Sequence, residues 1–180
     1  MVSELMREHR SVQPTKTERK MGREEVIVSK TDTAGRITYA NSVFCRMAGF
    51  DLHELIGAPH NLIRHPDMPR CVFKFLWDRI AAGHEVFAYV KNMSRNGDFY
   101  WVLAHVTPSY DGRGEIIGYH SNRRCPDDAA IAKVEPIYKS LREIELKNEP
   151  RLGIELSMAA FVNLLETNGV TYDEFIFSII

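Results

Sequence analysis

The order of its turn signals constrains the fold of this chain more than any other feature of the sequence. Turn-forming tetrapeptides and an Asn-Gly pair separate short runs rich in β-branched and aromatic residues, a pattern typical of antiparallel hairpins. Two such runs are expected near the start of the chain and three in its middle, at residues 25–32, 36–40, 85–93, 99–109 and 115–123. The sequence therefore predicts a five-stranded antiparallel sheet built from two separated hairpin regions.

Short segments with helical signals lie between these two groups of strands. Asn41 is an expected N-cap for a first helix that Gly49 ends, and Gly57 ends a second one. Pro69 is expected to open a longer amphipathic helix, which Gly83 ends. Helices bunched between hairpins favour an α+β fold over a doubly wound parallel sheet, and such a fold has a natural pocket between its two layers.

The remaining sequence divides the chain into three parts. Residues 1–24 are polar without a clean periodicity and are expected to form an N-terminal cap or flexible segment. Residues 25–125 form the expected sheet domain, and residues 126–180 form a C-terminal helical extension. Within this extension we expect helices at about 127–147 and 155–167, followed by an apolar tail.

The composition excludes several classes of function. The chain has 23 basic and 24 acidic residues, a balance that provides no basic field for nucleic acid or for an anionic membrane. It has no run of about 18 apolar residues and no signal peptide, so no membrane span is expected. The cysteines Cys45, Cys71 and Cys125 show no CxxC spacing and are interpreted as reduced thiols. We therefore expect a cytoplasmic protein.

The most distinctive polar stretch is Arg64-His65-Pro66-Asp67. An arginine fork suits phosphate oxygens, so this stretch is a candidate contact for a phosphorylated ligand. A surface loop with a local Arg–Asp ion pair is the alternative. Trp77, on the long amphipathic helix, is interpreted either as core packing or as the aromatic wall of a pocket. Asn92 lies on an expected strand, where it faces either solvent or the pocket.

Several stretches resemble PAS domains, and most specifically the PAS domains of bacterial aerotaxis receptors. The resemblance covers roughly residues 25 to 145 and rests on residues 31–41, 50–57, 64–69, 91–92, 96–98, 100–102 and 134–138. It implies a PAS fold that binds FAD without a covalent bond and reports redox or oxygen state in chemotaxis. It also implies that Arg64, His65, Asp67 and Trp77 contact FAD, and that Asn92 contacts the flavin edge.

Two alternatives to a flavin remain open. A histidine such as His65 is also a possible axial ligand of haem, as in other PAS families. A PAS domain without a cofactor can instead act only as an interaction or dimerisation module. Cys45 and Cys71 lie in no stretch that resembles the photoreactive cysteine motif, and we do not interpret the chain as a light sensor. The sequence contains no catalytic triad, paired carboxylates or HExxH pattern, so no enzymatic activity is expected.

We expect the chain to pass its signal to a separate partner protein. Alternation along the second long strand places Tyr100 and Trp101 on opposite faces of the sheet. One face would meet the pocket, and the other would be covered by a flanking helix or by a partner. The resemblance implies a signalling partner, such as a chemotaxis-type receptor or kinase, and we expect a homodimer. Redox change in a flavin would reach this surface through strand residues such as Asn92.

Overall fold

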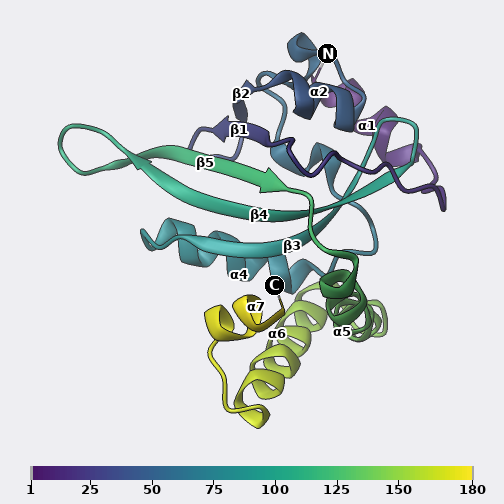
Figure 1. The fold of residues 1–180 in the computed structure, drawn as a ribbon, viewed down its shortest axis with the longest axis vertical. Coiled ribbons are helices and arrows are strands. Elements are labelled where there is room, and N and C mark those ends of the chain that lie inside the picture. The colour runs from purple at the N-terminus through teal and green to yellow at the C-terminus, as the bar shows by residue number, and fades with distance from the viewer. Residues whose placement is uncertain (1, 180) are drawn as a thin grey trace.

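The computed structural model describes residues 2–179 and has one mixed sheet-and-helix architecture (Figure 1). Its strands are β1 (Ile27–Thr31), β2 (Ile37–Ala40), β3 (Val86–Met93), β4 (Phe99–Tyr110) and β5 (Ile116–Arg124). Its helices are α1 (Val2–Ser11), α2 (Ser42–Ala48), α3 (Leu52–Leu55), the 3-10 turn η1 (His60–Ile63), α4 (Arg70–Ala81), α5 (Asp128–Leu146), α6 (Pro150–Thr167) and α7 (Tyr172–Ile179). The predicted order of two strands, short helices, one longer helix and three strands is confirmed.

The five strands form one antiparallel sheet in the order β2-β1-β5-β4-β3. The first hairpin, β1–β2, joins the later three strands through β1, which pairs with β5. Strands far apart in the sequence therefore lie side by side at the centre of the sheet. The turn at Asn96-Gly97 requires glycine, because Gly97 has a φ of 92° and its position leaves no room for a Cβ beside Gln13.

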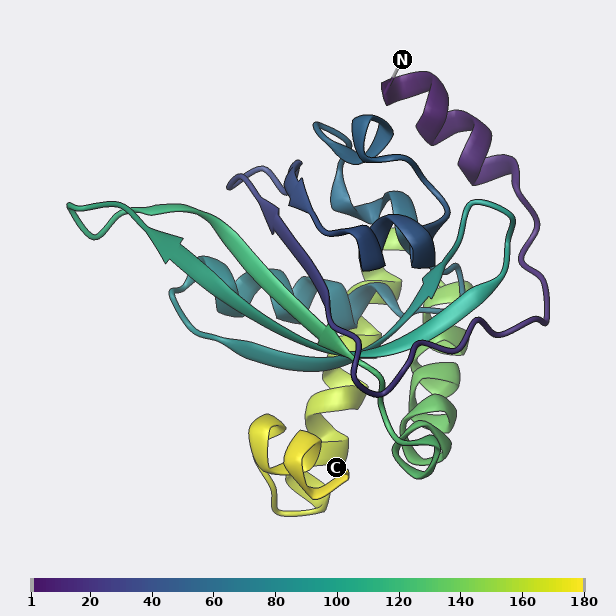
Figure 2. The ribbon, with the colours of Figure 1, turned by 45° about the horizontal axis from the view of Figure 1, so that its top comes forward.

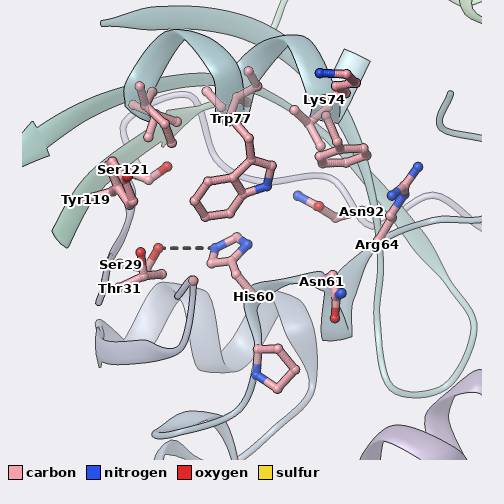
Figure 3. Close-up of a pocket in the computed structure, with 18 of the residues that line it drawn as sticks. Ser29, Thr31, His60, Asn61, Arg64, Lys74, Trp77, Asn92, Tyr119 and Ser121 are labelled. Atoms are coloured by element: carbon pink, nitrogen blue, oxygen red, sulfur yellow. Dashed lines mark hydrogen bonds between the residues drawn. The ribbon is translucent and has the colours of Figure 1, made fainter. Parts of the chain in front are cut away.

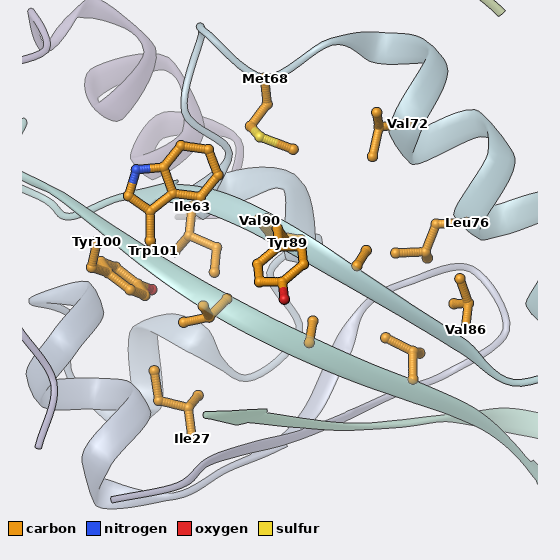
Figure 4. Close-up of a cluster of buried hydrophobic side chains, with 14 of the residues drawn as sticks. Ile27, Ile63, Met68, Val72, Leu76, Val86, Tyr89, Val90, Tyr100 and Trp101 are labelled. Carbon is orange, nitrogen blue, oxygen red and sulfur yellow. The ribbon is translucent and has the colours of Figure 1, made fainter. Parts of the chain in front are cut away.

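The helices between the hairpins begin and end where their capping residues predict. The Asn41 side chain accepts a hydrogen bond from the Phe44 amide at 3.0 Å, which satisfies a free donor at the start of α2. Gly49 ends α2 in the left-handed region with a φ of 75°. The helix α4 begins directly after Pro69. Figure 4 shows Val72 and Leu76 of α4 among the buried side chains that lie against the sheet.

The two faces of the sheet meet different layers. Tyr100 is fully buried on the inner face with the helices α2 to α4, whereas Trp101 on the outer face stacks on Tyr138 of α5 at 6.3 Å. The Tyr138 hydroxyl donates to the Tyr89 carbonyl oxygen at 2.9 Å. The prediction that Tyr100 and Trp101 point to opposite faces is therefore confirmed, and a helix of the same chain covers the outer face.

The three C-terminal helices gather below β3, on the side away from α1 and α2 (Figure 1). The helix α6 begins five residues before the expected position, because Pro150 starts the helix instead of breaking it. The apolar tail forms α7 and docks on its own domain, where Tyr172 Oη donates to the Phe87 carbonyl oxygen at 2.6 Å. No helix within residues 2–179 has the length and apolar character to cross a membrane.

The N-terminal segment is more ordered than a flexible cap. After α1, which lies at the top of Figure 2, residues 15–19 run beside the start of β4. The amide of Arg19 donates to the Phe99 carbonyl oxygen at 2.7 Å, and the amide of Phe99 donates to Thr17 at 3.0 Å. This segment was not expected to pair with the sheet, because its polar sequence has no strand alternation.

Candidate functional site

A cavity of about 450 Å³ lies between the inner face of the sheet and the helical layer (Figure 3). Its volume falls within the range of small-molecule sites in proteins. The sheet contributes small or polar side chains that leave room above the strands, including Ser29, Val90, Ala104 and Ser121. The helix α4 and the turn η1 form the opposite walls. The pocket that the fold class predicts is therefore present.

Two ring systems face each other across the cavity. Figure 3 shows the Trp77 indole from α4 above the imidazole of His60 from η1. Trp77 is held edge-on to Tyr119 at 5.4 Å, and the positive φ of Gly35 brings backbone under its ring, where a Cβ would lie 3.0 Å away. A flat aromatic ligand would find aromatic surface on both sides here.

His60 is a site residue that the sequence analysis missed. Its Nε2 lies 3.3 Å from Ser29 Oγ, and its ring stacks on Phe44 at 5.8 Å. Burial, and to a smaller extent the positive charge of Arg123, lower the pKa of His60 to about 3. The imidazole is therefore neutral at physiological pH and presents one donor and one acceptor nitrogen.

Arg64 and Asn92 lie together at one end of the cavity (Figure 3). Their backbones form an isolated antiparallel bridge, which ties the loop before α4 to the outer edge of β3, the last strand of the sheet. The guanidinium of Arg64 lies over the Phe73 ring, 4.2 Å from its centroid. Burial lowers the pKa of Arg64 to about 10, so the side chain remains a cation at neutral pH. The structure thus brings three predicted site residues, Arg64, Trp77 and Asn92, to one cavity.

Within residues 2–179, the wall of this cavity includes neither His65 nor Asp67. His65 is buried beneath the loop, and its Nδ1 accepts the Asp67 amide at 3.1 Å. Burial lowers the pKa of His65 to about 4. The Asp67 carboxylate lies 3.5 Å from His65 Nδ1 and accepts a hydrogen bond from Lys91 Nζ on the outer face at 2.8 Å. The sequence did not show that Arg64 lines the cavity while His65 and Asp67 do not, because the chain turns at Pro66.

A second cleft of about 540 Å³ adjoins the cavity and shares Asn61, Arg64 and Arg70 with it. Arg142 of α5 and His65 line its other side. Three arginines within one cleft provide positive charge and planar donor groups, which suit phosphate oxygens. The sequence analysis identified Arg64 for this role but did not anticipate Arg70 or Arg142, since Arg142 belongs to a helix outside the sheet domain.

Arg123, on β5, is the most unusual residue in the cavity wall. Its side chain is only 2% exposed, and its Nη2 donates to Ser29 Oγ. In the described part of the chain, its Nε and Nη1 have no hydrogen-bond acceptor. Strand alternation could have identified it, because Arg123 shares the inner face with Tyr119 and Ser121. No cysteine of residues 2–179 lines the cavity.

A buried carboxylate connects the cavity wall to the C-terminal helices. Glu145 of α5 accepts the amides of Arg70 and Cys71, both at 2.9 Å, at the first turn of α4. The hydroxyl of Ser157 in α6 donates to the same carboxylate at 3.2 Å. One side chain therefore joins α4, which carries Trp77, to both α5 and α6. This contact could not be predicted from the sequence, since a glutamate on a polar helix is normally exposed.

Comparison with known proteins agrees with this architecture. Residues 37–123 match the sequence family described as the PAS fold. The aerotaxis receptor of Escherichia coli is 44% identical over 115 residues, which cover 64% of this chain and 22% of the receptor. The nitrogen fixation regulatory protein of Klebsiella pneumoniae is 30% identical over 99 residues, which cover 55% of this chain and 20% of that protein. This chain therefore spans only about a fifth of these two relatives.

Solved structures give the same fold. A light-oxygen-voltage domain studied with a flavin analogue superposes with a TM-score of 0.54 at 18% identity, over 62% of this chain and 84% of that one. The dark structure of the blue-light photoreceptor Aureochrome1 LOV gives a TM-score of 0.53 at 22% identity, over 66% and 86% of the two chains. At such identities the likeness concerns the fold alone. Sequence and fold together show that this chain carries a PAS domain, similar to that of an aerotaxis receptor.

Proposed function

We propose that this chain is a signal-transduction sensor that binds FAD in the cavity of its PAS domain and reports redox or oxygen state to a signalling partner. One observation supports the proposal above all others. The cavity has aromatic walls at Trp77 and His60, and it continues into a cleft with the arginines Arg64, Arg70 and Arg142. This combination suits a flat ring joined to phosphates.

The cleft also favours FAD over FMN. A mononucleotide carries one phosphate, for which one or two cationic groups are enough. Here Arg64 and Arg70 lie in the wall that the two spaces share, and Arg142 adds positive charge within the cleft. We propose that Arg64 and Arg70 contact a diphosphate, while Trp77 and Asn92 contact the ring. His65 and Asp67 support the loop that carries Arg64, since neither lies in the cavity wall.

The proposed route of the signal runs from the cavity to α5. A bound flavin would supply a reducible ring whose charge and hydrogen bonding depend on its redox state. Asn92 and Trp77 would respond to such a change. Asn92 follows Lys91, which pairs with α5, and Trp77 lies on α4, whose first turn is bound by Glu145 of α5. Lys91, which follows Val90 on β3, bridges Asp67 at 2.8 Å and Glu135 of α5 at 3.7 Å. A shift of about 1–3 kcal/mol between two packing arrangements is sufficient for signalling.

Receptors and regulators among the relatives support a role in signalling, and we propose a chemotaxis-type receptor or kinase as the partner. The proposal includes a homodimer, a cytoplasmic location and no catalytic turnover. Ser29 Oγ lies 3.3 Å from His60 Nε2 in the cavity wall, but burial lowers the pKa of His60 to about 3, which makes the imidazole a poor general base. The site is therefore better suited to binding than to chemistry on a substrate.

The decisive experiment is the absorption spectrum of the full chain, measured in a fresh lysate and after purification. The visible bands of an oxidised flavin are expected, and chromatography of the heat-released cofactor should identify FAD. Arg64→Gln should reduce the amount of FAD retained, whereas Arg113→Gln, in the exposed β4–β5 turn, should leave it unchanged. An intense haem band, or a colourless protein that cannot be loaded with FAD, would contradict the proposal and support a haem sensor or a cofactor-free interaction module.

A further inference from the structure

Arg123 carries a buried positive charge that the chain itself does not neutralise. The guanidinium lies in the cavity floor with 2% of the residue exposed, and no carboxylate pairs with it within residues 2–179. Burial lowers its pKa to about 10, which still leaves it charged at neutral pH. A buried cation without a counter-charge costs free energy, so its presence calls for a compensating partner.

The groups around Arg123 satisfy only part of its hydrogen-bonding capacity. Ser29 Oγ accepts from Nη2, and the Phe44 ring lies 4.6 Å from the guanidinium carbon. Nε and Nη1 have no acceptor in the described chain. Thr31 Oγ1, in the same cavity wall, is also buried without a partner. Two unsatisfied polar groups in one wall indicate that the missing acceptors belong to a ligand.

The neighbouring His60 cannot supply the missing negative charge. It is held neutral by burial and by Arg123 itself, and its Nε2 is occupied with Ser29. Tyr100, the nearest acidic hydroxyl, has a pKa raised by burial well above neutral pH. Ser29, His60 and Arg123 therefore form a net positive part of the cavity wall.

We propose that Arg123, positioned by Ser29 and His60, is the group that recognises an electron-rich, carbonyl-bearing edge of the ligand ring. This inference rests on the proposed function, and it names the part of the ligand that the site selects. A heteroaromatic ring with acceptor atoms along its edge can accept from the N–H donors of Nε and Nη1 that Ser29 leaves free. Positive charge at this position binds the ring more tightly when reduction adds electron density to it.

The proposal separates ligand binding from the stability of the empty protein. Arg123→Met removes the charge and keeps a long side chain. Because it removes an unpaired buried cation, the ligand-free variant should unfold in urea at a midpoint no lower than that of the ligand-free wild type. Its affinity for added FAD should fall at least tenfold, and Arg123→Lys should retain more affinity than Arg123→Met. Arg124→Met, at the next and exposed position on β5, is the matched control and should change neither quantity.

The measurements are the FAD dissociation constant, from fluorescence quenching, and the urea midpoint of the ligand-free chain. The affinity should also be measured anaerobically for reduced FAD, where the loss in Arg123→Met should exceed the loss for the oxidised form. If the wild type binds FAD and Arg123→Met binds it equally well, this inference alone is overturned. A ligand-free variant that is less stable than wild type would show a structural role and overturn it too. Wild type that binds no FAD would remove the proposed function and this inference together.

Discussion

The carboxylate of Glu145 offers the sharpest test of how the C-terminal helices hold the cavity wall. Its two oxygens accept the amides of Arg70 and Cys71, and its side chain is only 2% exposed. Both amides belong to the first turn of α4, where backbone donors have no partner within the helix. The carboxylate also lies at the positive end of the helix dipole. Truncation to alanine therefore leaves two backbone donors at this buried junction unsatisfied.

The expected loss can be worked out from these two bonds. Each buried donor without a partner costs about 1–3 kcal/mol, so Glu145→Ala should lower the free energy of unfolding by about 2–6 kcal/mol. For a chain of this size that corresponds to a fall in Tm of roughly 4–24 °C. Glu145→Gln keeps one acceptor oxygen but turns an amide group toward the other donor, so an intermediate loss is expected. Glu143→Ala, at an exposed position of α5, is the control.

Urea unfolding, monitored by circular dichroism, measures the loss in the free energy of unfolding. Hydrogen exchange shows which amides lose their protection. The amides of Arg70 and Cys71 should lose protection in Glu145→Ala far more than amides at the centre of α4. A loss below about 1 kcal/mol, or unchanged protection at these two amides, would refute the reasoning, because the contact would then contribute less than an ordinary hydrogen bond. It would also disconnect α5 from the proposed signalling route.

Two further variants test other parts of the structure. Burial lowers the pKa of His65 to about 4, so below its ordinary pKa of 6.5 the unfolded chain binds the proton first. As the pH drops, His65 should contribute a loss of stability of about 2 kcal/mol at about pH 5. His65→Asn should remove this part of the urea-midpoint profile and leave the part due to His60, whereas His53→Asn at an exposed site should remove none of it. Gly153→Ala would place a Cβ 2.9 Å from the Glu145 carbonyl oxygen. It should lower the free energy of unfolding by about 1–3 kcal/mol, measured by thermal unfolding. The control Gly112→Ala, which has open space around it, should leave this free energy unchanged.

The sheet was predictable from the sequence because its signals are local. Each strand shows its own alternation, and each turn has its own chemistry, as at Asn96-Gly97. The ends of the strands accordingly lie within about two residues of their expected positions. Tyr100 and Trp101 could be assigned to opposite faces for the same reason, since neighbouring side chains on a strand must alternate. The order of the strands within the sheet was not predicted, because local signals do not determine which distant strands pair.

The composition of the site was only partly predictable, because it depends on contacts between distant segments. Arg64 and Asp67 stand three residues apart, yet one lines the cavity and the other pairs with Lys91 on the outer face. Only the path of the backbone through the turn at Pro66 determines that division. Arg123 was missed for a different reason. A charged residue near the end of a strand is usually exposed, but alternation places Arg123 on the inner face with Tyr119 and Ser121, and its register partner on β1 is Ile27.

The division of the loop from Arg64 to Cys71 explains how one segment can serve both the cavity and the outer helices. Its first residue faces the ligand space, and its last two begin the helix that carries the aromatic wall. Between them, the Pro66 carbonyl oxygen accepts a hydrogen bond from Arg142 of α5 at 2.9 Å. A ligand that moves Arg64 must therefore strain the contacts to α5 or move that helix as well, since the loop is held at both ends by packed structure. In the proposed sensor, the loop residues outside the cavity would act through the contacts that hold Arg64 and α4 in place, without touching the ligand.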